Sequence, residues 1–182
     1  GPLAVECARP RLNWINEAKS DKRGLRQSGY QVLVASAADE LALDRGDLWD
    51  SGKVDNDASI QVDYAGRPLA SRQQCFWKVR TWDQDGQPSP WSPPATWTMG
   101  LLAPQDWQAR WIKADDSASP DAPKSTALAP MPIFRRGFEL SKPVRRAMLY
   151  VSGLGQHEVR LKPRDDFPVE HQFLAGTGAV NA

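Results

Sequence analysis

Residues able to support nucleophilic catalysis are few and widely spaced in this 182-residue sequence. A serine or cysteine nucleophile needs a base within hydrogen-bond reach, and the only histidines are His157 and His171, both towards the C-terminal end. Ser152 lacks the preceding glycine of a Gly-x-Ser-x-Gly turn, and the glycines at 153 and 155 are followed by no third glycine. The sequence therefore predicts neither acyl transfer nor a phosphate-binding loop.

Paired carboxylates are also poorly placed for chemistry. Glycoside hydrolysis needs two carboxyl groups about 5–10 Å apart across a cleft. The pairs at 115–116 and 165–166 are sequence neighbours, which point to opposite sides of an extended chain. Residues 55–57 (Asp-Asn-Asp) resemble part of a calcium loop but lack its glycine and bidentate glutamate, so a solvated turn is favoured. We expect no catalytic residue, no metal ion and no cofactor.

The two cysteines, Cys7 and Cys75, have no metal-ligand spacing to each other or to histidine. A disulfide between them requires Cα atoms within about 7 Å, which sequence does not determine. The sequence leaves open a disulfide and, as the favoured alternative, two buried thiols.

Charge and hydropathy exclude two classes of partner. Lys and Arg number 23 against 22 Asp and Glu, a net charge of +1 that provides no long-range attraction for a polyanion. No apolar run approaches the roughly 18–20 residues of a membrane-spanning helix. We expect no nucleic-acid or membrane partner. Gly1 and Pro2 are consistent with a protease-cleavage scar that removed any export signal, and a periplasmic or secreted location is favoured over the cytoplasm.

Short strands separated by Gly- and Pro-rich turns dominate the first hundred residues. Strands are expected at 12–15, 30–35, 48–49, 59–62, 75–82 and 96–99, with one short helical stretch at 37–43. Turn residues cluster at 50–52, 65–68 and 83–86. Such spacing without intervening long helices predicts an all-β sandwich of about 100 residues.

The expected strand at 75–82 separates its side chains into two chemically different sets. Cys75, Trp77, Val79 and Thr81 are predicted to face the core, and Phe76, Lys78, Arg80 and Trp82 to face outward. Trp91, shortly after, offers a further indole for these cations. A structural cation–π ladder of Lys78, Arg80, Trp82 and Trp91 is favoured over a sugar-stacking platform, because the cations would cover the rings.

The character of the chain changes after residue 100. Further strands are expected at 107–112, 133–140, 146–155 and 158–161, with a polar, Pro-rich connection at 114–132. We place the boundary at 101–104, giving a sandwich over 1–101 and a second β domain over 102–182.

Several ordered segments carry a resemblance to a known family. They include Gln-Ser-Gly-Tyr-Gln-Val-Leu-Val-Ala-Ser at 27–36, Leu-Trp-Asp-Ser-Gly-Lys-Val at 48–54, Phe-Trp-Lys-Val-Arg-Thr-Trp-Asp at 76–83 and Asp-Trp-Gln-Ala-Arg-Trp-Ile at 106–112. Together with residues 2–14 and 134–161, they resemble the amino-terminal region of bacterial α-L-rhamnosidases. The resemblance implies an all-β protein, with a fibronectin type III/immunoglobulin-like β-sandwich followed by a partial jelly-roll β-sandwich. In that family, catalysis belongs to a later (α/α)₆ barrel with an inverting acid–base mechanism, and none of the barrel's motifs occurs here.

The sequence departs from the family at two places. Cys75 stands where an aromatic residue is expected, and residues 162–168 match no family segment. The second domain is therefore expected to be an incomplete jelly roll that exposes apolar residues, namely Phe134, Phe138, Met148 and Tyr150.

The resemblance implies a non-catalytic accessory role in an α-L-rhamnosidase-like glycoside hydrolase. The expected partners are other domains of the parent glycosidase and, through it, rhamnose-containing glycans. One alternative is a carbohydrate-binding module in which Trp82, Trp91 or Trp111 stacks on sugar rings. A third hypothesis is an adhesion or protein-interaction sandwich, suggested by fold-level analogy.

Overall fold

The structure is a computed structural model that describes residues 1–17, 23–113, 133–139, 141, 143 and 146–159. It divides into two compact units, Gly1–Trp107 and Gln108–Ala182. Every strand and helix of the described residues lies in the first unit: β1 (Arg11–Leu12), β2 (Gln27–Ala35), α1 (Ala38–Ala42), β3 (Trp49–Asp50), β4 (Val62–Asp63), β5 (Gln74–Asp83), β6 (Ala95–Thr98) and the 3₁₀ turn η1 (Pro104–Asp106).

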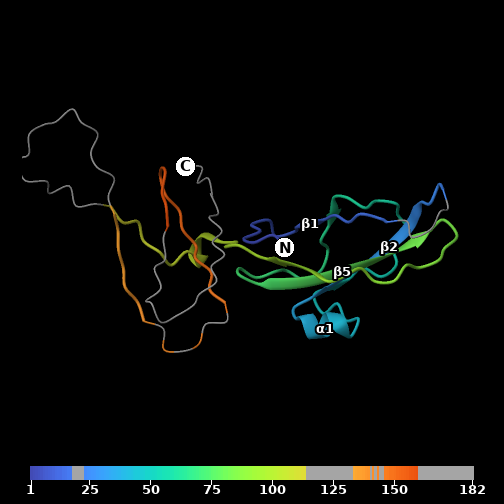
Figure 1. The fold of residues 1–182 in the computed structure, drawn as a ribbon, viewed down its shortest axis with the longest axis horizontal. Coiled ribbons are helices and arrows are strands. Elements are labelled where there is room, and N and C mark those ends of the chain that lie inside the picture. Colours follow the sequence, from blue (N-terminus) through green and yellow to red (C-terminus); the bar gives the residue numbers. More distant parts are fainter. Residues whose placement is uncertain (18–22, 114–132, 140, 142, 144–145, 160–182) are drawn as a thin grey trace, which may run out of the picture. The chain divides into compact units, whose positions relative to one another are not determined.

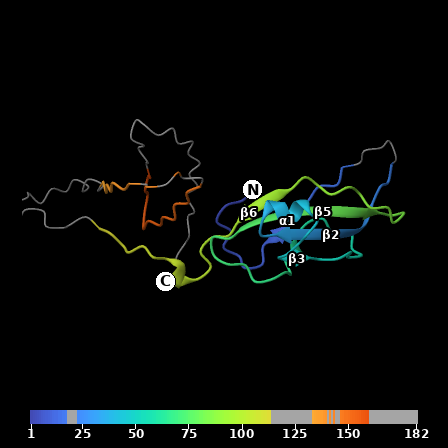
Figure 2. The same ribbon diagram turned by 90° about the horizontal axis from the view of Figure 1, so that it is seen from below.

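The first unit is built on an antiparallel sheet of four strands in the order β3-β2-β5-β6 (Figure 2), with a second sheet of β1 and β4. The long pair β2 and β5 sets Val32 opposite Val79 and Leu33 opposite Lys78. Because side chains alternate along a strand, β2 contributes to two separate apolar clusters. The clusters confirm the predicted all-β sandwich, and the alternation predicted for 30–35 matches them.

The main core lies between the two sheets. Tyr30, Val32 and Val34 of β2 face this core. The other strands, apart from β3, and the segments next to them supply the remaining buried side chains. These side chains are Leu12, Val62, Tyr64, Leu69, Cys75, Val79, Trp97 and Met99, while Trp14, Trp49 and Trp77 pack against them partly buried. Tyr64, 2% exposed, donates its hydroxyl hydrogen to the carbonyl oxygen of Arg67 at 2.7 Å.

The opposite face of the central sheet is covered by α1, which Figure 1 shows across the sheet from β1. Leu41, 1% exposed, packs there with Leu33 and Ala35. The helix has five residues and no side-chain N-cap, so its intrinsic helix propensity is too small to stabilise it. The packing of Leu41 against the sheet must therefore provide that stability. The helix expected at 37–43 is confirmed.

The presence of this cover corrects one expectation. Lys78 was expected on the outward face of the sandwich, but it is buried there and only 7% exposed. Its strand position does face away from the main core as the alternation predicts. The burial arises because α1 closes over this part of the second face.

The free edge of β6 is covered by the N-terminal segment. The amide of Thr98 donates to the carbonyl oxygen of Pro2 at 3.0 Å, and the amide of Val5 donates to the carbonyl oxygen of Thr98 at 2.9 Å. The amide of Gly100 then donates to the Val5 carbonyl oxygen at 2.8 Å. These bonds occupy donors and acceptors that an open edge would present to another chain.

Two strands are shorter than expected: the one expected at 12–15 is reduced to β1 (Arg11–Leu12), and the one expected at 59–62 is shortened for a local reason. The segment at 59–62 was predicted to be extended, yet β4 begins only at Val62. Gln61 has a φ of 59°, in the left-handed region, which interrupts an extended chain. Its amide donates instead to the side-chain oxygen of Asn13 at 2.7 Å.

The described residues of the second unit form no strand, so the strands expected at 107–112 and in the described parts of 133–140, 146–155 and 158–161 are not formed there. A strand needs a hydrogen-bonded neighbour, and no such ladder occurs in those residues. Phe134, Phe138 and Met148 are 51%, 64% and 36% exposed, and Tyr150 is partly buried. The expected loop at 114–132 and the divergence after 161 lie outside the described residues. The domain limits 1–101 and 102–182 remain a prediction.

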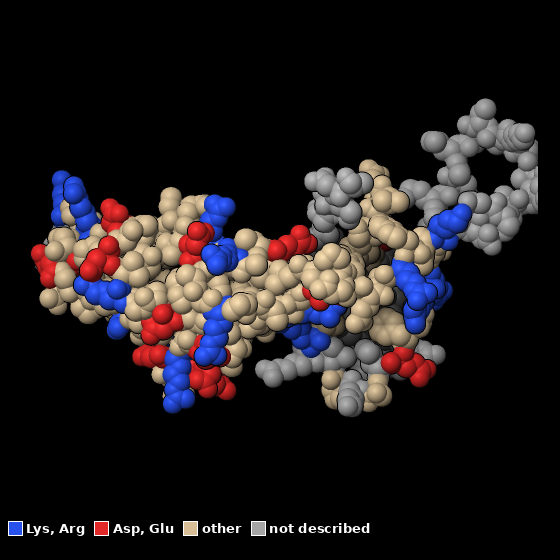
Figure 3. All heavy atoms as spheres, turned by 180° about the vertical axis from the view of Figure 1, so that it is seen from behind, with Lys and Arg blue, Asp and Glu red and all other residues tan. Residues whose placement is uncertain are grey.

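Among the described residues, no helix is long and apolar enough to cross a membrane. No group of three or more His, Cys, Asp or Glu side chains there is arranged to hold a metal ion. On the face shown in Figure 3, acidic and basic side chains of the first unit are intermixed, without a broad region of one sign.

Candidate functional site

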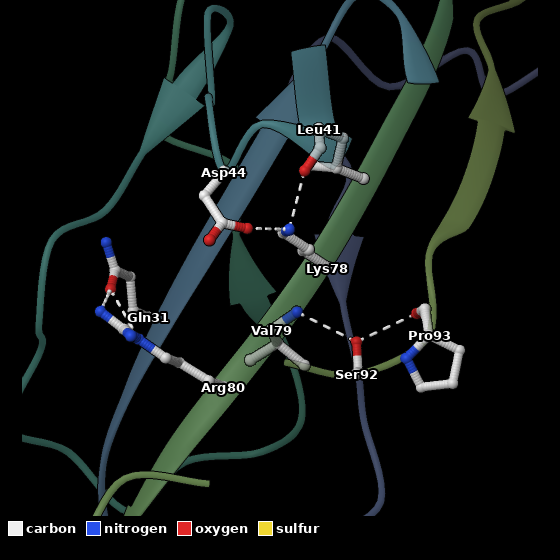
Figure 4. A network of polar contacts seen from close by, with 8 residues as sticks. All are labelled: Gln31, Leu41, Asp44, Lys78, Val79, Arg80, Ser92 and Pro93. Carbon is white, nitrogen blue, oxygen red and sulfur yellow. Dashed lines mark hydrogen bonds and ion pairs between the residues drawn. The ribbon is translucent and has the colours of Figure 1, made fainter. Parts of the chain in front are cut away.

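The candidate site lies along β5, on the face that α1 partly covers (Figure 4). Lys78 and Arg80 are two positions apart on this strand, so both side chains leave the same face. Trp82 continues the series, and Trp91 joins it from the segment that precedes β6. The structure thus brings together Lys78, Arg80, Trp82 and Trp91, which we call the tryptophan–cation cluster.

Lys78 connects the cluster to the end of α1. Its ammonium donates to the carbonyl oxygen of Leu41 at 2.7 Å and forms a hydrogen-bonded ion pair with Asp44. The same nitrogen stands 5.1 Å from the ring centre of Trp91. The lysine therefore satisfies a carbonyl at the end of the helix while its charge is balanced by a carboxylate and an indole face.

Asp44 follows α1 with a φ of 57°, which turns the chain so that its carboxylate meets Lys78. The hydrogen bond from Lys78 is the main cause that lowers the pKa of Asp44 below its usual value, against a smaller opposing effect of desolvation. The carboxylate is therefore ionised near neutral pH and acts as an acceptor. A carboxyl group held in this way is unsuited to the role of general acid.

Arg80 lies between two indoles. Its guanidinium carbon is 4.6 Å from the ring centre of Trp91 and 5.0 Å from that of Trp82. Two of its nitrogens donate to the side-chain oxygen of Gln31, at 3.0 and 2.6 Å. Lys53 adds a further cation 5.4 Å from the ring of Trp82. The indoles of Trp82 and Trp91 thus each interact with two cations.

A Ser- and Pro-rich segment at 88–93 positions Trp91. The hydroxyls of Ser89 and Ser92 accept hydrogen bonds from the amides of Thr81 and Val79, at 3.0 and 3.1 Å (Figure 4 shows the second). The amides of these serines donate back to the carbonyl oxygens of the same two β5 residues, at 2.7 and 2.8 Å. The segment pairs with β5 beyond the end of β6, where proline amides cannot donate. Trp91 lies between the two serines and is fixed by them.

Sequence reasoning named four cluster members but missed Gln31, Asp44 and Lys53. These come from β2, from the end of α1 and from the turn after β3, and no local pattern marks them. Trp111, the third tryptophan considered for sugar stacking, lies in the second unit and is 65% exposed. The tryptophan–cation cluster consists of first-unit residues alone.

A shallow, open hollow of about 480 Å³ lies elsewhere on the first unit, lined by residues that include Tyr30, Trp49, Asn56, Gln61 and Asp63. Among the described residues that line it, Asp63 is the single carboxylate. Glycoside hydrolysis by acid and base requires two. The hollow therefore lacks the groups for that reaction.

Cys7 and Cys75 are both free thiols, which excludes the disulfide. The expectation of two buried thiols is correct for Cys75 alone, since Cys7 is exposed. Cys7 lies in the N-terminal segment outside the core, whereas Cys75 occupies an inward position of β5 and is 0% exposed.

Thiol reactivity is expected to distinguish the two cysteines. Burial, with a smaller effect of the Asp47 charge, raises the pKa of Cys75 to about 11, so at pH 8 almost none of it is thiolate. An aryl disulfide reagent at pH 8 is expected to modify one thiol of the folded chain, at Cys7, and both thiols after unfolding in urea. Mass mapping of the labelled peptides checks this. Rapid modification of Cys75 in the folded chain would contradict its burial.

Comparison with known protein families decides the identity of the first unit. A family model described as "Rha78A-like, N-terminal immunoglobulin domain" matches residues 1–103. The chain belongs to this family. The immunoglobulin domain so defined corresponds to the sandwich described above, and its match ends within the segment that follows β6.

Curated relatives of this chain are named α-L-rhamnosidases. One from Streptomyces avermitilis is 50% identical over 113 residues, which is 62% of this chain and 11% of that protein. One from Alteromonas sp. is 38% identical over 164 residues, which is 90% of this chain and 18% of that protein. The chain therefore spans between about a tenth and a fifth of the length of these relatives.

Solved structures give the same result. The α-L-rhamnosidase from Dictyoglumus thermophilum matches with a TM-score of 0.60 at 34% identity, over 63% of this chain and 13% of that one. The Streptomyces avermitilis α-L-rhamnosidase complexed with L-rhamnose matches with a TM-score of 0.58 at 48% identity, over 64% and 11%. The resemblance expected from the sequence is confirmed.

Proposed function

We propose that this chain is a non-catalytic accessory part of an α-L-rhamnosidase, in which the immunoglobulin domain supports and positions other domains of the enzyme. The substrates of that enzyme would be rhamnose-containing glycans, and its other domains would be the partners of this chain. Support comes from relatives that are named α-L-rhamnosidases and are matched over a small part of their length.

The structural observation that supports this proposal most is that the charged side chains of the tryptophan–cation cluster have partners within the immunoglobulin domain. Lys78 is bonded to Asp44 and to the Leu41 carbonyl, Arg80 is bonded to Gln31, and both cations stand against indole rings. The described hollow contains one carboxylate. Such an arrangement stabilises the surface of a sandwich and leaves no pair of carboxyl groups there for acid–base catalysis.

A hydrolysis assay tests this proposal directly. The purified chain is expected to release no rhamnose from an aryl α-L-rhamnoside above the rate of a buffer blank, with the Streptomyces avermitilis α-L-rhamnosidase as the positive control. Turnover that co-purifies with the chain through two unrelated columns would refute the non-catalytic role.

The carbohydrate-binding alternative rests on Trp82, Trp91 and Trp111. The cations beside Trp82 and Trp91 weaken it at those positions, whereas the 65% exposure of Trp111 keeps it open there. Titration with rhamnose and with a rhamnose-containing oligosaccharide, followed by tryptophan fluorescence, is expected to give no saturable change. A saturable change that is lost in Trp111→Ala and retained in Trp107→Ala would favour a binding module instead.

A further inference from the structure

The chain that leaves β6 is fastened back onto the turn that precedes β5. The amide of Met99 donates to the carbonyl oxygen of Gln73 at 2.8 Å, and the amide of Arg72 donates to that of Gly100 at 2.9 Å. These bonds continue the pairing of β5 with β6 beyond the last strand residue. The exit segment at 100–106 therefore begins in a fixed position on the sandwich.

Ser71 and Asp106 then hold the rest of the exit segment. The hydroxyl oxygen of Ser71 accepts a hydrogen bond from the amide of Leu102 at 2.8 Å, and its hydrogen is donated to Oδ2 of Asp106. The same carboxylate oxygen accepts the amide of Ala103 at 3.0 Å. Two side chains thus satisfy two consecutive backbone donors that lie in no strand.

Arg72 completes the attachment from the same turn. Its guanidinium donates to the carbonyl oxygen of Asp106 at 2.8 Å, while its amide bonds to Gly100. Arg72 is therefore hydrogen-bonded to both ends of the exit segment, at Gly100 and at Asp106. We call Ser71, Arg72 and Asp106 the exit clamp.

Two further features stiffen the clamped segment. Pro104 occupies the first position of η1, where its fixed φ suits a helical turn. The hydrogen bond from Ser71 is the main cause that lowers the pKa of Asp106, desolvation opposes it, and the amide of Ala103 and the charge of Arg72 act in the same direction as Ser71. The carboxylate is therefore ionised near neutral pH and keeps its acceptor role.

We propose that the exit clamp sets the direction in which the chain leaves the immunoglobulin domain, so that the part of the protein beyond it starts from a defined point and heading. This inference rests on the proposed positioning function and names the residues that perform it. Residues 71 and 106 are 35 positions apart, so their contact joins the two segments that border the exit. A direct link of this kind limits exit motion more than a free Gly- or Ser-rich linker would.

Hydrogen exchange of the full 182-residue chain tests the clamp at its own amides. Ser71→Ala removes the acceptor of Leu102 and the donor to Asp106, and Asp106→Ala removes the acceptor of Ala103. Exchange at residues 102 and 103 is expected to become about tenfold faster in both variants, the size of one lost hydrogen bond. The amides of β2 and β5 should keep their protection.

Matched variants separate the clamp from general effects. Ser89→Ala removes a serine acceptor of a backbone amide near the other end of β5 and should leave exchange at residues 102 and 103 unchanged. Asp106→Asn retains a side-chain oxygen and should restore most of the protection. A nitroxide spin label is attached to Gln105→Cys in a chain that also carries Cys7→Ser. Its electron paramagnetic resonance spectrum should show an immobile label in that chain and a mobile label once Ser71→Ala or Asp106→Ala is added.

Two results would overturn the clamp. The first is exchange at 102 and 103 in the parent chain at the rate of an unstructured peptide, with a mobile label at Gln105. The second is loss of protection in β2 and β5 together with the exit segment in Ser71→Ala, which would make the serine a general stabiliser. The two proposals fail separately. Hydrolytic activity of the chain would refute the accessory role without affecting the exit clamp, and either result above would refute the exit clamp without showing hydrolytic activity.

Discussion

Truncation of Leu41 to alanine is expected to lower the free energy of unfolding by about 3 kcal/mol, the usual cost of removing a buried leucine. Leu41 is the one buried side chain of α1 and packs against Leu33 and Ala35. A five-residue helix has little stability of its own, so the loss should detach α1 from the sheet. Urea unfolding followed by circular dichroism measures the difference.

Leu43→Ala is the matched control, because Leu43 adjoins the same helix and is 63% exposed. Its substitution is expected to change the free energy of unfolding by less than about 0.5 kcal/mol. Equal effects of the two substitutions would show that α1 does not seal the second face of the sheet. Because both substitutions delete the same side-chain atoms, the difference between their effects reports the burial of Leu41.

Replacement of Lys78 by alanine is expected to be destabilising by about 2–3 kcal/mol, measured in the same way. The substitution removes one of the two hydrogen-bond donors to the Leu41 carbonyl, the charged partner of Asp44 and one of the two cations at the ring of Trp91. The Asp44 side chain is 58% exposed, so most of the effect should come from the hydrogen bond and the packed aliphatic stem, with little from the ion pair.

Two variants resolve these contributions. Lys78→Met keeps most of the aliphatic part of the side chain and removes the ammonium that donates the hydrogen bonds. We expect it to lower the free energy of unfolding by about half as much as Lys78→Ala. Lys53→Ala breaks the comparable but exposed pair with Asp55, whose side chains are 47% and 82% exposed, and should cost less than about 0.5 kcal/mol. If Lys78→Ala were as mild as Lys53→Ala, the burial of the lysine would have no energetic consequence.

The period of two in β2 and β5 made much of the sandwich predictable. Tyr30, Val32 and Val34 alternate with Leu33 and Ala35, and this pattern alone separates the two apolar clusters. The short helix was predictable from its apolar spacing, and the indoles and cations along β5 were predictable because alternation puts them on one face. Beyond residue 107 the same reasoning expected strands that the described residues do not form.

The expectation at Lys78 shows where local pattern is insufficient. Alternation assigns the side of the sheet but not what covers that side. The cover is α1, whose contacts with Lys78 come from residues 34 and 37 positions away in the sequence. A cation that alternation places on an outward face is thereby buried, which no window of neighbouring residues can reveal.

The sequence by itself determined the fold class, the family resemblance and the strand faces, because each depends on local spacing or on ordered motifs. The tertiary structure alone decided the burial of Lys78, the pairing of Ser89 and Ser92 with β5, and the contact of Ser71 with Asp106. Each of these depends on side-chain hydrogen bonds between residues 8–37 positions apart. Such bonds form only after the apolar clusters have brought the segments together, so their partners are set by packing and not by local sequence.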